Sequence, residues 1–211
     1  MEEIDIRNVI RSLEGYRTSV LYDSIYPALS IMKSLLENYR TAHIVSFSNS
    51  AFRILKIVLS SFKIEASNLK HIVINKTGEC EDAYASFSYE DLEDCVTFLS
   101  KLKGLMVFYG NWILKKIVGD DEYWRLAFEL FDLLDPDAWV FSFLPEKAYS
   151  PYERSLLSLL YDVTMIVKKV GEPYMFGEEV YSLEIFESII KEVLPGTIYF
   201  KVGKEYSFIP R

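Results

Sequence analysis

The chain has 211 residues, of which 50% are hydrophobic and 15% aromatic, so it can bury a large core and is not intrinsically disordered. Its net charge of −8 disfavours non-specific binding to nucleic acids and to anionic membranes, because an acidic surface repels their phosphates. No basic-then-apolar leader opens the sequence, and no apolar run reaches the ~20 residues of a membrane span, so we expect a cytoplasmic protein.

Cysteine and glutamine counts bear on the chain's environment. The two cysteines, Cys80 and Cys95, form no CxxC or CxxH unit, so they predict no zinc site, and a disulfide between them stays open. Glutamine is absent although lysine and glutamate are plentiful, a bias that hyperthermophile proteins often show. We therefore expect a thermophilic source. We predict no metal and no cofactor for this chain.

The predicted elements alternate between helix and strand. Apolar residues recur at helical spacing over residues 4–14 and stop before Gly15, which predicts a first helix. Further helices are predicted over residues 28–39, 50–62, 89–103, 121–134, 151–160 and 182–193. Strands are predicted over residues 19–22, 43–47, 71–75, 105–109, 139–143 and 163–168. Two last strands, 197–201 and 206–209, flank Gly203 and predict a hairpin.

The central strands are apolar on both faces, as the runs IVSFS, IVIN, LMVFY, WVFSF and VTMIV illustrate. Strands of this kind are covered by helices on both sides of a mainly parallel sheet. We therefore predict an α/β fold, a three-layer α/β/α, doubly wound, mainly parallel sheet. It would form a single domain over residues 1–211, with an N-terminal helix at 1–14 and a C-terminal β-hairpin at 196–211.

Over residues 15–211, this order of elements resembles the RecA-like ATPase core in the compact form of KaiC-type and other archaeal RecA-superfamily proteins. SVLYDSIYPALSIMKSLL, from residue 19, falls at the family's phosphate loop, GxxxxGK[ST], and GLMVFYGNW, from residue 104, at its magnesium-Asp strand. YDVTMIVKK resembles a later strand of the family, with Asp162 at the Asp position. The chain looks most like an uncharacterised archaeal family of degenerate RecA-like proteins from hyperthermophiles. The resemblance implies a RecA-like fold and self-association as a dimer or larger ring.

The chemical groups of the phosphate loop have no counterpart in this sequence. With Asp23 at the first glycine of the motif, Ala28 stands at the second, Leu29 at the lysine and Ser30 at the Ser/Thr. Glycines let successive N–H groups approach phosphate, and the lysine supplies positive charge. Tyr26 fills the loop instead, and only Ser30 keeps the family's residue type.

The magnesium position also lacks its carboxylate, because the strand at 105–109 runs into Gly110 and Asn111. Positioning and charge stabilisation account for nearly all phosphoryl-transfer catalysis. We therefore predict a non-catalytic RecA-like interaction or regulatory module, not an ordinary ATPase, whose partner is a second copy or another protein. Two alternatives stay open. One is a small-molecule or nucleotide-binding protein, or an enzyme, that uses the strand carboxyl edge; the other is a nucleic-acid accessory protein with a contiguous Lys/Arg face.

Polar and aromatic side chains near the carboxyl ends of the strands are the candidate ligand or partner residues, because α/β proteins bind ligands there. The loop KAYSPYERS, from residue 147, adds basic and aromatic groups. No catalytic residue or metal ligand is predicted. The candidates are Asp23, Ser24, Tyr26, Ser30, Ser48, Asn49, Asn111, Ser142, Tyr149, Tyr152 and Arg154.

Several of these features also have a structural interpretation. Ser48 predicts a helix cap, as does Ser150 before a proline at the first helical position. His43 and His71 precede apolar strand runs without a second ligand nearby, so we interpret them as strand-edge residues. The acidic run GDDEYW predicts a helix start. Loop or strand-end tyrosines that could mark an interface are Tyr22, Tyr26, Tyr149, Tyr152 and Tyr174.

Overall fold

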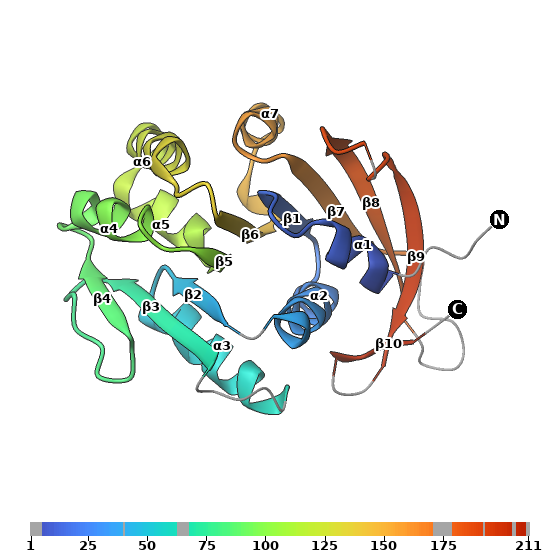
Figure 1. Ribbon diagram of the computed structural model, residues 1–211, viewed down its shortest axis with the longest axis horizontal. Helices are drawn as coiled ribbons and strands as arrows, with labels where there is room; N and C mark the ends of the chain where they lie inside the picture. The colour runs from blue at the N-terminus through green and yellow to red at the C-terminus, as the bar shows by residue number, and fades with distance from the viewer. Residues whose placement is uncertain are drawn as a thin grey trace. The chain divides into compact units, whose positions relative to one another are not determined.

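The computed structural model describes residues 6–39, 41–62, 68–170, 179–191, 193–203 and 206–209. Helices and strands alternate along most of this path (Figure 1). The chain divides into two compact units, one within residues 1–40 and 143–211 and the other within residues 41–142. Strand β6 (Ala138–Pro145) spans the boundary between them.

The first unit combines both ends of the chain. Its strands follow the order β10-β9-β8-β7-β1. The pair β1–β7 is parallel, and the pairs β7–β8, β8–β9 and β9–β10 are antiparallel. The antiparallel pair β9–β10 confirms the predicted C-terminal hairpin. The elements are α1 (Ile6–Ser12), β1 (Thr18–Tyr22), α2 (Ile25–Asn38), the short 3₁₀ helix η2 (Glu146–Ala148), α7 (Pro151–Leu160), β7 (Val163–Lys169), β8 (Val180–Ser188), β9 (Gly196–Val202) and β10 (Phe208–Ile209).

The second unit is built on parallel strands in the order β5-β2-β3-β4. Ile44 and Val45 of β2 are fully buried on opposite faces of this sheet, which is why the run is apolar on both parities. Its elements are β2 (Ala42–Ser46), α3 (Asn49–Ser61), β3 (Leu69–Asn75), β4 (Ala85–Ser88), α4 (Leu92–Leu99), β5 (Gly104–Tyr109), α5 (Asn111–Val118) and α6 (Asp120–Leu133).

Helices cover both faces of the strands in each unit. In the first, α7 lies on one side of β1 and β7, and α1 and α2 lie on the other (Figure 1). In the second, α3 lies opposite α4, α5 and α6 (Figure 1). The chain therefore has the layered, mainly parallel α/β architecture that the apolar strands predict.

The predicted helix at residues 182–193 is wrong, because residues 180–188 form strand β8. Tyr181, Leu183 and Ile185 are buried at every second position, whereas Glu184 and Phe186 are exposed. This period of two is the signature of a strand with one covered face. Strand β4 and helix α5 were not predicted, and the helix expected over residues 89–103 is limited to α4.

Gly110 is a position where an added methyl group should be costly. It caps α5 with φ +84°, and a Cβ built there would lie 2.9 Å from the Cβ of Ala51. We expect Gly110→Ala to lower the free energy of unfolding by about 3 kcal/mol, because left-handed strain and a steric clash add. Urea unfolding followed by circular dichroism would measure the change.

Gly104→Ala is the matched control. Gly104 has φ +77°, but a Cβ there meets no atom within 4 Å, so only the strain of about 1–2 kcal/mol remains. Equal losses for the two variants would show that the contact with Ala51 has no energetic consequence.

Candidate functional site

The connection between β1 and α2 is only two residues long. Strand β1 ends at Tyr22 and helix α2 begins at Ile25, which leaves Asp23 and Ser24 between them. Six of the eight residues that align with the phosphate-loop motif, residues 25–30, are therefore helical. The sequence predicted a helix from residue 28, three residues later than observed. A loop that binds phosphate needs non-helical backbone whose N–H groups converge on the anion.

Ser30, the residue that keeps the family's type, points its hydroxyl at its own helix. Its side chain is fully buried, and its Oγ donates a hydrogen bond to the carbonyl of Tyr26 at 3.2 Å. Ala28 and Leu29 are also buried in this helix, with 2% and 4% of their surface exposed. Pro27 has no N–H group to offer in the first turn. The start of α2 therefore packs into the core.

Tyr26 ties the beginning of α2 to the C-terminal hairpin. Its hydroxyl donates to the carbonyl of Gly203 at 3.0 Å, and its ring centroid lies 4.8 Å from that of Tyr206. Burial, followed by the nearby Tyr206 and Glu179, raises the pKa of Tyr26. Tyr206 itself has φ +56°, a conformation that costs an L-residue about 1–2 kcal/mol, which the ring contact helps to offset.

The charged groups beside this connection are mainly acidic. An oxygen of Asp23 accepts a hydrogen bond from the N–H of Lys169 at 3.2 Å, and the Lys169 ammonium lies 2.5 Å from Glu179. Glu179 also accepts from the hydroxyl of Tyr181. The hydrogen bond from Lys169, followed by that from Tyr181, lowers the pKa of Glu179. Two carboxylates and one ammonium leave a net negative charge, which repels phosphate.

In the second unit, the candidate polar residues hold the backbone together. The Oγ of Ser48 caps α3 by accepting from the N–H of Ala51 at 3.0 Å, as predicted. Asn49 accepts from the amide of Asn75 at 2.9 Å. Ser142 is fully buried. Of the predicted ligand residues, Ser48 therefore caps a helix, Asn49 pairs with an amide and Ser142 lies in the core.

Asn111 follows β5 at the position where the resemblance places the magnesium region. Only 4% of its surface is exposed, and its amide donates to the hydroxyl of Tyr123 at 3.4 Å. Its Oδ1 is buried and accepts no hydrogen bond from the residues that the structure describes. A single neutral amide oxygen is a weak ligand for Mg²⁺, which in phosphoryl-transfer sites is held by carboxylates and substrate phosphates.

The residues predicted in the loop after β6 have different environments. Tyr149 is 2% exposed and packs in the core, whereas Tyr152 is 73% exposed. Arg154 forms an ion pair with Glu146 at 2.8 Å. Ser150 caps α7 in a reciprocal capping box with Glu153, as predicted. Tyr174 lies outside the described residues.

Asp162, which the resemblance places at a family Asp, lies at the opposite end of the strands from the ligand edge. It precedes β7, and its carboxylate accepts a hydrogen bond from the N–H of Arg17 at 2.8 Å. Arg17 in turn precedes β1. This aspartate therefore fixes the start of the β1–β7 pair.

The residues that sequence reasoning missed around the β1–α2 connection come from distant segments. Glu179 and Tyr181 adjoin or belong to β8, and Gly203 and Tyr206 belong to the C-terminal hairpin region. The alternation of apolar residues over 181–185 was the available signal for β8. No local signal showed that Tyr206 would lie against Tyr26.

The described residues hold neither a metal-binding cluster nor a membrane-spanning helix. No three His, Cys, Asp or Glu side chains come together there as a metal-binding group. Cys80 and Cys95 are both free thiols, and burial raises the pKa of Cys95 to about 12. No helix in this part of the chain combines the length and hydropathy needed to cross a bilayer.

Comparisons with known proteins place the fold. No family model and no curated protein sequence matches the chain. Among solved structures, it is similar to a KaiC-like protein from the hyperthermophilic archaeon Pyrococcus horikoshii OT3, with a TM-score of 0.68 and 9% identity over 94% of this chain and 90% of that one. A second protein, from a structural study of the same organism, matches with a TM-score of 0.62 and 14% identity over 91% and 97% of the two chains.

These matches identify the fold class and nothing narrower. The chain has a RecA/KaiC-like α/β fold, as its order of elements predicts.

The two histidines make stability depend on pH. His43 and His71 lie in β2 and β3, and burial, followed by the charges of Lys70 and Lys56 respectively, lowers their pKa. The unfolded chain therefore binds more protons than the folded chain near pH 6. We expect the urea midpoint to fall as pH decreases from about 7.5 to about 5.5.

The double variant His43→Gln, His71→Gln removes both groups and should flatten this dependence. Circular dichroism at each pH would measure the two midpoints. The same slope in the variant and the parent would assign the pH dependence to other groups.

Proposed function

We propose that the chain is a non-catalytic RecA-like interaction or regulatory module that has lost the phosphate-loop and magnesium-binding residues of its fold. The observation that supports this most strongly is the two-residue connection between β1 and α2. A phosphate loop needs several residues of free backbone at that position, and here those residues are wound into the helix.

The electrostatics of the same region support the proposal. ATP carries several negative charges, and its binding sites in this fold supply a lysine and a magnesium ion to balance them. Here Leu29 stands at the lysine position and is buried, and Asp23 and Glu179 add negative charge. Binding a triphosphate would require unwinding the start of α2 and breaking the contacts of Tyr26.

The alternative of a small ligand at the strand carboxyl edge has less support. Ser48, Asn49 and Ser30 already use their side chains in hydrogen bonds within the protein. The nucleic-acid alternative depends on a contiguous basic face, and the net charge of −8 opposes it.

We infer that the module acts by binding protein, with a second copy as the first partner to test. Large apolar side chains remain exposed on the first unit, including Leu159 at 71%, Ile189 at 77% and Leu194 at 71%. Exposed apolar groups of this size are common at protein interfaces. Self-association is also what the RecA-like resemblance implies.

Nucleotide titration tests the loss of the phosphate site. We expect no binding heat and no change in melting temperature with ATP, ADP or GTP and Mg²⁺ at up to about 1 mM, because the connection offers neither loop nor cation. Isothermal titration and thermal shift would measure this. Micromolar nucleotide binding accompanied by hydrolysis would refute the proposal.

Sedimentation velocity tests self-association. Over about 1–100 μM protein, we expect the sedimentation coefficient to rise with concentration, as mass action requires of a reversible oligomer. The variant Leu194→Glu places a charge at one of these exposed apolar positions and is a first probe of the interface. A monomer across the whole concentration range would exclude a second copy as the partner.

A further inference from the structure

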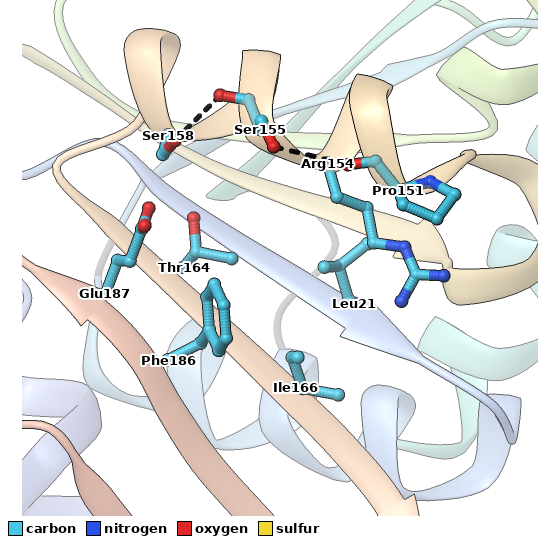
Figure 2. A pocket seen from close by; sticks show the side chains of 9 residues that line it. All are labelled: Leu21, Pro151, Arg154, Ser155, Ser158, Thr164, Ile166, Phe186 and Glu187. Carbon is cyan, nitrogen blue, oxygen red and sulfur yellow. Dashed lines mark hydrogen bonds between the residues drawn. The ribbon is translucent and has the colours of Figure 1, made fainter.

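A cleft of about 350 Å³ lies in the first unit, between α7 and the strand face that this helix covers (Figure 2). Leu21 of β1 and Ile166 of β7 supply its apolar floor. Phe186 of β8 lines the same space with 55% of its surface exposed. An exposed ring beside an apolar floor, in a cleft of this volume, suits a small organic molecule.

One end of the cleft is positively charged. Arg154 lines it and pairs with Glu146 at 2.8 Å, and the ammonium of Lys168 lies 3.4 Å from the same carboxylate oxygen. Two cations share one carboxylate, so one positive charge is left over. This end therefore suits a carboxylate group.

The other end presents acceptors. Figure 2 shows Glu187 and Ser158 at the end opposite Arg154, with Phe186 between the two ends. Ser158 donates its hydrogen to the carbonyl of Ser155 at 2.7 Å, so its oxygen is left to accept. Glu187 is exposed and forms no ion pair with a described residue. A carboxylate and a hydroxyl oxygen together suit an ammonium group.

We propose that this cleft binds a small bipolar molecule, with a carboxylate at Arg154, an ammonium at Glu187 and an apolar segment against Phe186. Arg154 and Ser158 lie four residues apart on α7, about 6 Å along the helix axis, so the two charges must be separated by several carbons. An ordinary α-amino acid holds them too close together. The proposal does not depend on the proposed function, because the cleft uses none of the residues between β1 and α2.

Titration of the full chain with 6-aminohexanoate tests the site. We expect a Kd on the order of 0.1–1 mM, as suits a ligand of this size, measured by isothermal titration. Backbone NMR shifts should be confined to α7, β1, β7 and β8. Hexanoate and hexylamine each lack one charge and should bind about tenfold more weakly. No binding at about 10 mM, or equal binding of hexanoate, would overturn the proposal.

Variants at both ends identify the contacts. Arg154→Gln and Glu187→Gln should each weaken binding of 6-aminohexanoate about tenfold. Arg154→Lys keeps a positive charge for Glu146 and serves where Arg154→Gln lowers stability. The matched controls are Arg125→Gln and Glu129→Gln, a surface ion pair of the second unit at 2.8 Å, which should leave the Kd unchanged. An unchanged Kd in a folded Arg154→Gln or Glu187→Gln variant would also refute the proposal.

Discussion

The direct passage of β1 into α2 is the constraint on which the rest of the first unit depends. The N–H of Asp23 donates to the carbonyl of Val167, and the Asp23 carboxylate accepts from the N–H of Lys169. Asp23 thus extends the hydrogen bonding between β1 and β7 by one residue beyond the end of β1, through both its backbone and its side chain. Because the chain is held to β7 up to this residue, the helix that starts at Ile25 has a fixed origin and no free loop remains.

The C-terminal strands complete this arrangement. β8 and β9 continue the sheet outward from β7, and their covered face is aromatic, with ring centroids 5.8 Å apart for Tyr181 and Phe200 and 5.4 Å apart for Phe200 and Phe208. Each such buried ring stabilises the fold by about 1.5–3 kcal/mol. The contacts of Tyr26 with Gly203 and Tyr206 then connect this hairpin to α2. An aromatic and acidic cluster therefore lies beside the connection between β1 and α2.

The sequence predicted those strands and helix ends that depend on the residues close to them in the chain. Apolar runs such as IVSFS gave the buried parallel strands, and Ser150 with Pro151 gave the start of α7 at the observed residue. The sequence-based prediction was wrong at β8, because the apolar residues there fit both a helical and a strand period. The burial of Tyr181, Leu183 and Ile185 at every second position identifies the strand. At the candidate site, the absence of phosphate-loop chemistry, inferred from residue types, stays a prediction. The partners of Tyr26 come from a segment about 180 residues away, and no local pattern reveals such a contact.

The same strands that cover the start of α2 also account for the cleft beneath α7. In the described chain α7 is the last α-helix, and it covers β1 and β7. Strand β8 extends the sheet beyond this cover, so its residues alternate between a buried face and an open one, with Phe186 on the open side. Arg154 of α7 and Lys168 of β7 both pair with Glu146, which leaves one cation unbalanced. Adding antiparallel strands in place of further helices therefore fills one side of the sheet with aromatic rings and leaves a charged, partly apolar surface on the other.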